Sequence, residues 1–323
     1  MKKICLIGCG NVGSRHLQAI AKLDFAINVD IVEPFSESIQ RGKKRLDEIK
    51  YDIDSHVFSW HEDIQELKDK PDLTIVATTA TGRAELLCKL TDKGHSRFLI
   101  EKMVCQSNDE YEKILSKFHE KNVKAWVNTN PRCFSSYQKL KEIFEDSDNI
   151  HFSVTASNVS ALGTNTIHYM DLFAYFTNDY DITMNGDLLI NEIFPNKHGS
   201  HLMEFAGTVV GKIKNGSSIS LSFLPSDKLP TIVNIVGKEK HLLIDETNQK
   251  ILDMVNHENE KFSFSYEHAS TITTKISQEI LQRDSCELTT IENSYILHKE
   301  IFRIFNLHVN KITGQQMELC PIT

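Results

Sequence analysis

Residues 2–13 read KKICLIGCGNVG, an apolar stretch that runs into three glycines with the spacing G-x-G-x-x-G. The apolar residues predict a short buried strand, and helical periodicity follows at once in residues 14–22. A strand, a glycine turn and a helix in this order predict dinucleotide binding, because the glycines allow a tight turn and a close approach of the backbone to a pyrophosphate. Free N–H groups at the start of the helix would face the phosphates. The predicted cofactor-binding turn comprises Gly8, Gly10, Asn11, Val12 and Gly13.

Strand and helix patterns continue to alternate up to residue 125. Short apolar runs predict further strands at 29–32, 57–58, 73–77, 98–100 and 123–127. The segments between them predict helices at 36–50, 64–68, 83–93 and 109–121. This order predicts an α/β domain with a doubly wound parallel sheet of the Rossmann type, which binds ligands at the carboxyl ends of its strands.

The pattern changes in the second part of the chain. Helices are expected at 135–144, 167–176, 273–282 and 290–305, and strands at 151–157, 207–213, 218–223, 231–236 and 241–245. Alternating strands joined by short turns indicate a mostly antiparallel sheet. We therefore predict two domains, a Rossmann domain at 1–125 and an α+β domain at 126–323.

Composition excludes several classes of function. The net charge of −8 makes nucleic acid and anionic membranes poor partners, and no apolar run approaches the roughly 18 residues of a membrane span. The seven cysteines are scattered and form no C-x-x-C pair, which predicts reduced thiols in a cytoplasmic protein. No metal site is expected, since His198 and His201 lack a nearby carboxylate or cysteine.

Glu33 ends the second predicted strand, twenty residues after Gly13. A carboxylate at this place can accept hydrogen bonds from both ribose hydroxyls and would repel a 2′-phosphate. It therefore predicts NAD as the cofactor rather than NADP. The alternative is an exposed surface carboxylate without a ligand.

Lys102 follows the strand predicted at 98–100, directly after Glu101. Its ammonium would supply charge and three hydrogen-bond donors in the cleft, where it could stabilise an alkoxide or hold a substrate hydroxyl. The alternative is a solvated surface lysine.

Four segments carry a resemblance to a known family. They are GCGNVG (8–13), DLTIVATTATGRAELL (72–87), LIEKM (99–103) and NTIHYMDLFAYF (165–176). With these segments the sequence resembles the Gfo/Idh/MocA oxidoreductases over essentially its whole length. The resemblance implies that the second domain carries a large open sheet, binds the substrate and forms a homodimer or homotetramer.

The family resemblance also implies roles for residues of the first domain. Lys102 would be a catalytic or substrate-positioning residue that also contacts the cofactor, and Glu101 would lie near the nicotinamide ribose. Thr78 and Thr79 would lie under the adenine side of the cofactor. In the family a proline follows the lysine, and here Met103 takes its place.

His168 and Asp171 are three residues apart on a predicted helix, so they share a face. By resemblance the pair would move a proton to or from a sugar hydroxyl while hydride passes to the nicotinamide. Thr164 or Asn165 could cap the helix. Many relatives carry a carboxylate at the place of Thr164, so this chain would offer fewer acidic groups to a substrate. The alternative is a helix start with a structural histidine.

Four more polar residues belong to the predicted substrate site or its surroundings. Asn130, Arg132 and Asn165 are predicted substrate contacts, with Asn128 beside them at the domain junction. Arg132 could bind a carboxylate or a phosphate by two parallel hydrogen bonds. Hydrogen bonding between the domains is the alternative for the junction residues.

Together these residues predict an NAD-dependent dehydrogenase. It would act on a secondary hydroxyl, or the matching ketone, of a sugar, cyclitol or sugar nucleotide. Two alternatives stay open: an NAD(H)-binding sensor or regulator without turnover, and a reductase of the same fold that acts on a tetrapyrrole or an imine. The pair Tyr137 and Lys141 matches the Y-x-x-x-K of short-chain dehydrogenases, but the glycine turn lacks the TGxxxGxG of that class.

Overall fold

The computed structural model describes residues 1–51, 55–157, 159, 161–196, 199, 201–259 and 262–323. The chain forms two compact units, each with its own core. The first comprises Met1–Cys105, Asp109–Asn130 and Glu267–Ile291. The second comprises Gln106–Asn108, Pro131–Tyr266 and Glu292–Thr323.

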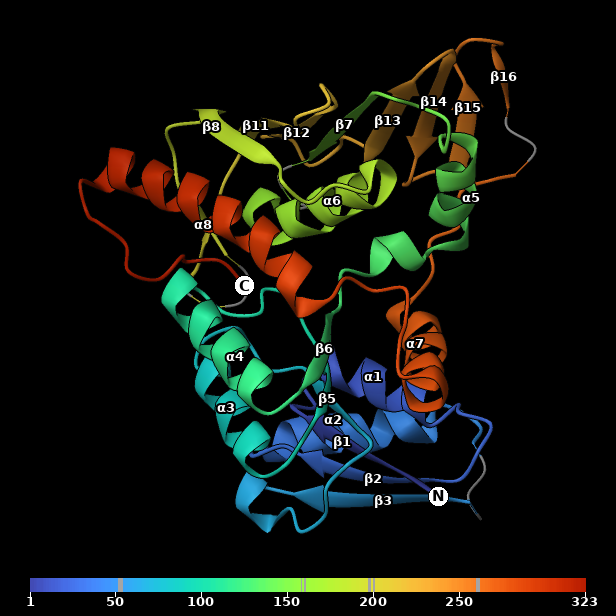
Figure 1. Ribbon diagram of the computed structural model, residues 1–323, viewed down its shortest axis with the longest axis vertical. Coiled ribbons are helices and arrows are strands. Elements are labelled where there is room, and N and C mark those ends of the chain that lie inside the picture. Colours follow the sequence, from blue (N-terminus) through green and yellow to red (C-terminus); the bar gives the residue numbers. More distant parts are fainter. Residues whose placement is uncertain (52–54, 158, 160, 197–198, 200, 260–261) are drawn as a thin grey trace. The chain divides into compact units, whose positions relative to one another are not determined.

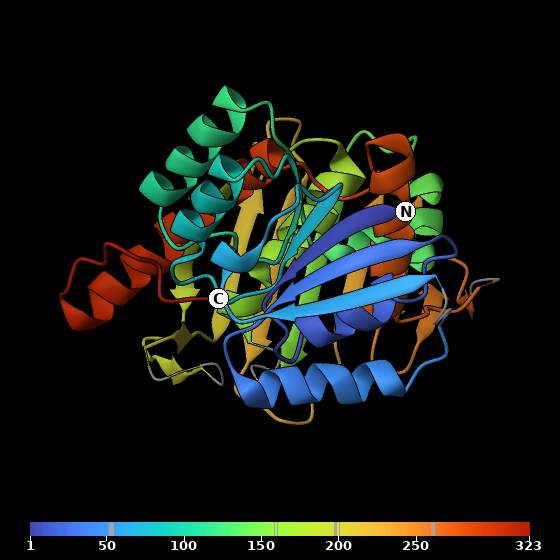
Figure 2. The same cartoon turned by 90° about the horizontal axis from the view of Figure 1, so that it is seen from below.

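The N-terminal unit is built on six parallel strands in the order β3-β2-β1-β4-β5-β6, seen side by side in Figure 2. The strands are β1 (Lys2–Ile7), β2 (Ile27–Val32), β3 (His56–His61), β4 (Leu73–Val76), β5 (Arg97–Ile100) and β6 (Lys124–Val127). The helices between them are α1 (Gly13–Ile20), α2 (Ser36–Asp47), α3 (Arg83–Asp92) and α4 (Asn108–Glu120), with a short 3-10 turn at Ile64–Glu66. The prediction of a Rossmann sheet is confirmed. Its strand order reverses between β1 and β4, which opens a crevice at their carboxyl ends.

One later helix also belongs to this unit. The sequence placed the boundary at residue 126, but residues 267–291, with α7 (Ala269–Arg283), pack with the N-terminal sheet. The Thr274 hydroxyl of α7 donates a hydrogen bond to the carbonyl of Ala19 over 2.8 Å. Local periodicity predicts the helix, but it does not indicate which of the two units the helix packs with.

The C-terminal unit is built on an eight-stranded sheet in the order β16-β15-β14-β13-β7-β12-β11-β8. The strands are β7 (Ile150–Ser157), β8 (Thr183–Leu189), β11 (Gly207–Lys212), β12 (Ser218–Leu224), β13 (Ile232–Gly237), β14 (Lys240–Asp245), β15 (Lys250–Asp253) and β16 (Glu258–Asn259). All neighbours are antiparallel except β7 and β12. A separate hairpin joins β9 (Phe194–Pro195) to β10 (Met203–Glu204). The mostly antiparallel sheet was predicted, whereas the polar strand β8 and the short β15 and β16 were missed.

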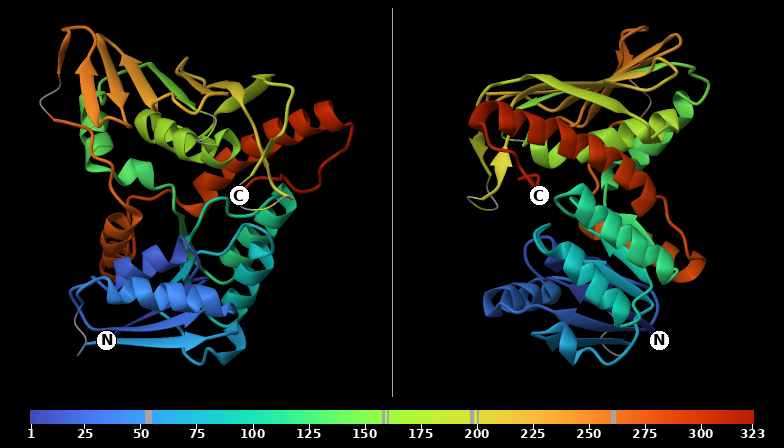
Figure 3. Two further views of the ribbon diagram at one scale, coloured as in Figure 1. Left: turned by 180° about the vertical axis from the view of Figure 1, so that it is seen from behind. Right: turned by 60° about the vertical axis from the view of Figure 1, so that its left-hand side comes forward.

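The helices of this unit cover one face of the sheet, as Figures 1 and 3 show. They are α5 (Ser135–Ile143), α6 (Leu162–Thr177) and α8 (Ile291–Thr313). Phe152 and Val154 of β7 are buried on this face, and the ring centroid of Phe152 lies 6.2 Å from that of Phe173 on α6. Among the described residues no helix lies over the other face in these views, as the resemblance implied.

No helix of the described chain combines the length and the apolar character needed to cross a bilayer.

Candidate functional site

The glycine turn has the geometry that its spacing predicts. Gly8 has a φ of +85°, a value that side-chain-bearing residues rarely adopt. A Cβ at Gly13 would lie 1.9 Å from the carbonyl oxygen of Gly8, so only glycine fits between the turn and α1. A Cβ at Gly10 would meet nothing within 4 Å, which leaves its backbone open to a ligand.

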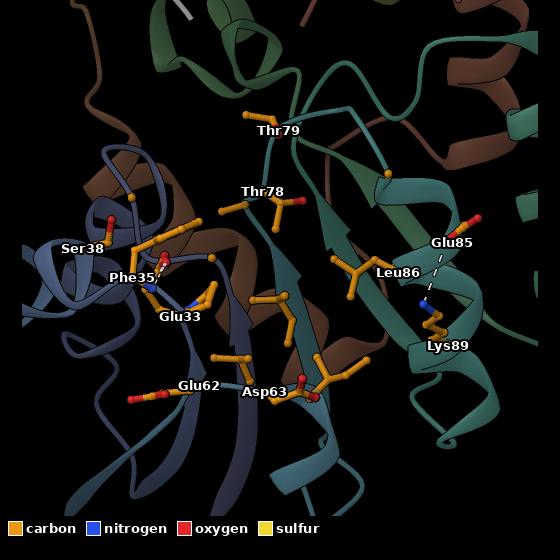
Figure 4. Close-up of a pocket in the computed structure, with 18 residues that line it drawn as sticks. Glu33, Phe35, Ser38, Glu62, Asp63, Thr78, Thr79, Glu85, Leu86 and Lys89 are labelled. Carbon is orange, nitrogen blue, oxygen red and sulfur yellow. Dashed lines mark hydrogen bonds and ion pairs between the residues drawn. The ribbon is translucent and has the colours of Figure 1, made fainter. Parts of the chain in front are cut away.

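A pocket of about 560 Å³ lies beside this turn, within the roughly 300–1,000 Å³ typical of cofactor sites. Figure 4 shows Glu33, Phe35 and Ser38 on one side and Glu85, Leu86 and Lys89 of α3 on the other. The predicted residues that line it are Gly8, Gly10, Glu33, Thr78 and Thr79. Residues that the sequence did not single out are Phe35, Ser38, Glu62, Asp63, Ile64, Gly82, Glu85, Leu86 and Lys89. In the sequence, the only indication of these residues was their position after a predicted strand or in the helix that follows it.

Glu33 is held in place by backbone amides. Its Oε2 accepts a hydrogen bond from the Cys9 amide over 2.6 Å, and its Oε1 accepts one from the Phe35 amide over 3.1 Å. The side chain is only 4% exposed, so it is no free surface carboxylate. Each carboxylate oxygen can accept more than one hydrogen bond, so both can still receive a ribose hydroxyl. The residues of the pocket thus fit a dinucleotide.

The pocket is acidic apart from one lysine. Glu62 and Asp63 line it together with Glu33 and Glu85, and Lys89 lies 4.0 Å from a carboxylate oxygen of Glu85. The four carboxylates outnumber the single ammonium among these side chains, so the lining carries a net negative charge.

Arg83, which the sequence did not single out, joins two strand-end turns. Its guanidinium is buried and donates to the carbonyl of Glu101 over 2.5 Å and to the carbonyls of Met103 and Thr78. Burial lowers the pKa of this guanidinium to about 10. Because a buried charge must be hydrogen-bonded, Arg83 fixes the turn after β5 against the turn after β4. The peptide between Lys102 and Met103 in that turn is cis.

Glu101 lies at the centre of a hydrogen-bond network. Its Oε1 contacts the Nε2 of His16 over 2.8 Å and accepts from the Nδ2 of Asn128 over 2.5 Å. The Nδ1 of His16 lies 2.9 Å from the hydroxyl of Thr273 on α7. Burial alone would raise the pKa of Glu101, but the hydrogen bonds from His16 and Asn128 and the charges of His16 and Lys102 lower it to about 2. Asn128, placed near the substrate site from the sequence, is thus a partner of Glu101.

In the C-terminal unit, a buried carboxylate binds the start of α6. Glu204 of β10 accepts from the Gly163 amide over 2.8 Å, from the Thr164 amide over 3.2 Å and also from the Thr164 hydroxyl. The helix begins at Leu162, so Thr164 and Asn165 lie in its first turn and do not cap it as proposed. The Glu204 carboxylate thus contacts Thr164, the residue that stands where the family resemblance led us to expect a carboxylate.

Arg132 and Asp171 are partners of each other. The Nη1 of Arg132 lies 3.1 Å from the Oδ1 of Asp171 and 3.0 Å from the Tyr180 hydroxyl. The guanidinium also stacks 4.8 Å from the ring centroid of Tyr175. Burial would lower the pKa of Arg132, but the Asp171 carboxylate and the contact with Tyr180 together outweigh burial and raise that pKa. His168 lies three residues before Asp171 on α6 and is half-buried.

The predicted catalytic residues are divided between the two units. Lys102 belongs to the N-terminal unit, as does Asn130 at its end, whereas Arg132, Asn165, His168 and Asp171 belong to the C-terminal unit. Among the described residues no three His, Cys, Asp or Glu side chains gather in a metal site; His198 lies outside those residues. The Tyr137 hydroxyl donates to Glu246 over 2.5 Å within the C-terminal unit.

Residues 2–129 match the Gfo/Idh/MocA family model, described as an oxidoreductase family with an NAD-binding Rossmann fold. This match confirms the resemblance for the segments at 8–13, 72–87 and 99–103, whereas the segment at 165–176 lies beyond the matched residues. A search of the curated proteins finds no match.

Three solved structures share the fold over nearly the whole chain. An oxidoreductase from Agrobacterium radiobacter in complex with NAD+, L-tartaric acid and magnesium has a TM-score of 0.72 at 14% identity, over 96% of this chain and 97% of that one. The UDP-N-acetylglucosamine 3-dehydrogenase GnnA from Acidithiobacillus ferrooxidans has a TM-score of 0.71 at 13% identity, over 96% and 98%. The WlbA dehydrogenase from Bordetella pertussis, in complex with NADH and UDP-GlcNAcA, has a TM-score of 0.69 at 15% identity, over 94% and 96%.

Proposed function

We propose that this protein is an NAD-dependent dehydrogenase of polyhydroxylated substrates, because residues 2–129 match the model of an oxidoreductase family with an NAD-binding Rossmann fold. It oxidises a secondary hydroxyl of a sugar, cyclitol or sugar nucleotide, or reduces the matching ketone. The observation that carries the proposal is the pocket at the glycine turn, with the Glu33 carboxylate held on its wall by the Cys9 amide.

NAD is the proposed cofactor rather than NADP. Support comes from the carboxylates of Glu33, Glu62 and Asp63, which line the pocket where the ribose and adenine would bind. A 2′-phosphate would meet their negative charge at close range. Gly8, Gly10, Asn11, Val12 and Gly13 would hold the pyrophosphate, and Thr78 and Thr79 the adenine side.

The proposed catalytic roles fall on side chains of each unit. The nicotinamide ring, when bound, accepts or supplies the hydride. Lys102 polarises the substrate oxygen with its ammonium, and His168 takes or returns the hydroxyl proton. Asp171 acts through its contact with Arg132, while Asn130 and Asn165 bind neighbouring hydroxyls. Glu101 faces the nicotinamide ribose.

The substrate class draws support from related proteins. Three proteins of the same fold are a UDP-N-acetylglucosamine 3-dehydrogenase, a dehydrogenase in complex with UDP-GlcNAcA and an oxidoreductase in complex with L-tartaric acid. The two bound ligands and UDP-N-acetylglucosamine all carry several hydroxyl or carboxylate groups. We further propose a homodimer or homotetramer that forms through the open sheet face, and a cytoplasmic location, which the seven free cysteines favour.

A substrate panel tests the proposal directly. The purified protein, with NAD+ or NADP+, is offered UDP-sugars, aldoses, cyclitols and hydroxy acids, and formation of the reduced cofactor is followed by absorbance. Turnover with NAD+ on one polyhydroxylated class is expected. Tight NADH binding without turnover on any member would favour a sensor. In a second assay the protein is offered NADH or NADPH with imines and tetrapyrroles, and oxidation of the cofactor only there would favour a reductase.

A further inference from the structure

His16 is completely buried on α1, three residues after the last glycine of the turn. Its two ring nitrogens contact groups from distant parts of the chain, Glu101 after β5 at 2.8 Å and Thr273 on α7 at 2.9 Å. The helix that would carry the pyrophosphate at its start is thereby joined to the turn that bears Lys102.

The proton positions follow from the chemistry of the partners. An ionised carboxylate only accepts hydrogen bonds, so the Nε2 of His16 donates to Glu101. The Thr273 hydroxyl can donate to Nδ1 or accept from it, so it holds the ring in either protonation state. Asn128 donates to the same Oε1 of Glu101 from the end of β6. The Glu101 oxygen therefore receives donors from two elements, and its side chain has little freedom to turn.

The backbone of the same turn is fixed independently by Arg83. This residue binds the carbonyls of Glu101 and Met103, the two neighbours of Lys102 in sequence. His16 acts instead on the Glu101 side chain, whose exposed fraction is 12%. The two residues thus have separable effects, one on the backbone and one on the carboxylate.

We propose that His16 is a positioning residue for the dehydrogenase reaction: it directs the Glu101 carboxylate beside Lys102 and links that turn to the cofactor-binding helix. The inference rests on the proposed function, because it assigns His16 a part in placing the reactive end of the cofactor. It goes beyond a packing role, which would require only that α1 and α7 remain in contact.

The positioning role of His16 should be visible in how the protein responds to pH. The groups that face Glu101 are His16 from α1, Asn128 after β6 and the adjacent Lys102, with Arg83 of α3 at its carbonyl. Without His16, Glu101 loses a hydrogen bond and a nearby charge that favour its ionised form. Its pKa should therefore rise from the value of about 2, because burial favours the protonated form. Glu101 then becomes protonated under mildly acidic conditions.

The test uses adjacent threonines of α7 as matched variants. Thr273→Val removes the partner of the His16 Nδ1, whereas Thr274→Val removes hydrogen bonds to the carbonyls of Ala19 and Ser270 and leaves the contacts of His16 and Glu101 in place. His16→Leu removes the ring, and His16→Gln retains a donor without the imidazole charge. Each full-length variant is assayed for NADH binding and for turnover between pH 5 and pH 8, relative to the wild type.

In His16→Leu we expect kcat to fall at least tenfold at pH 8, and NADH binding and kcat to acquire an additional loss towards pH 5. His16→Gln should show the same loss at lower pH than His16→Leu, and Thr273→Val a several-fold fall in kcat. Thr274→Val should match the wild type. If His16→Leu does not fold, the pH profile of His16→Gln and the kcat values of Thr273→Val and Thr274→Val decide whether His16 has the positioning role.

Wild-type pH profiles in both His16 variants, or equal effects of the two threonine changes, would overturn the positioning role. If no substrate turns over in the wild type, the dehydrogenase proposal fails by itself. The NADH-binding profiles still report on His16 in that case.

Discussion

The amide of Cys9, in the middle of the glycine turn, donates a 2.6 Å hydrogen bond to the Oε2 of Glu33 at the end of β2. Glu33, which would bind the ribose hydroxyls, is thereby hydrogen-bonded to the turn that would hold the pyrophosphate. The same carboxylate also accepts from the Phe35 amide. These hydrogen bonds link the glycine turn after β1 to the end of the neighbouring strand β2.

Replacing Glu33 should change cofactor choice. Glu33→Gln keeps the size and an acceptor but removes the charge, so NADH binding should weaken about tenfold, as expected for loss of charged hydrogen bonds. Binding of NADPH should weaken less or improve, because the repulsion of its 2′-phosphate is reduced. Calorimetric titration with both cofactors measures the ratio of the NADH and NADPH dissociation constants. Glu37→Gln serves as the control, because Glu37 is an exposed glutamate of α2 that does not line the pocket. An unchanged ratio of the NADH and NADPH dissociation constants in Glu33→Gln would count against the ribose role.

Removing the Lys102 ammonium should affect turnover more than binding. Lys102→Ala is expected to lower kcat at least about a hundredfold, the usual effect of losing one charge-stabilising group. The dissociation constant for NADH should stay within a few-fold, since the pocket that would bind adenosine does not include Lys102. Steady-state kinetics and NADH titration separate the two effects. Turnover near that of the wild type would exclude the assigned role.

Breaking the contact between Asp171 and Arg132 should cost stability. Asp171→Asn leaves the guanidinium without its anionic partner in a site where Asp171 is fully buried. Loss of one member of a buried ion pair typically costs about 3–5 kcal/mol of unfolding free energy. Urea denaturation measures this, and the double variant Asp171→Leu/Arg132→Met should recover part of the loss. A stable Asp171→Asn protein that has lost only kcat would instead indicate direct action on the substrate.

Acid should destabilise the N-terminal unit through Glu101. Its pKa in the folded chain is about 2, against 4.5 for an ordinary glutamate, so the folded state favours the ionised form. This contribution is present above pH 4.5 and is lost as the pH falls towards 2. The pKa difference is 4.5 − 2 = 2.5 units, so at roughly 1.4 kcal/mol for each unit the contribution amounts to about 3.5 kcal/mol. Denaturation curves between pH 2 and pH 6 should show this dependence in the wild type and a weaker one in His16→Leu; identical curves would contradict it.

The local pattern of residues was enough to predict the Rossmann sheet and its ligand turn. Most of its strands contain a short apolar run, and the requirement for glycine at Gly8 and Gly13 arises within six residues. Glu33 could be placed because a strand end has a defined position relative to the turn. The family resemblance added Lys102 and His168, as residues at matching places in motifs.

Only the tertiary structure identified the partners of these residues. His16 meets Thr273 from 257 positions away, Glu204 reaches Thr164 across 40 positions, and Arg132 meets Asp171 across 39. Periodicity describes which side of an element is buried, but not which distant polar group will face it there. Such pairs depend on how separate elements pack, and a buried polar group is stable only when packing supplies its partner. The sequence by itself therefore determined the fold of the cofactor domain and its ligand turn, and the packing of distant segments decided how the side chains around Lys102 and on α6 are held.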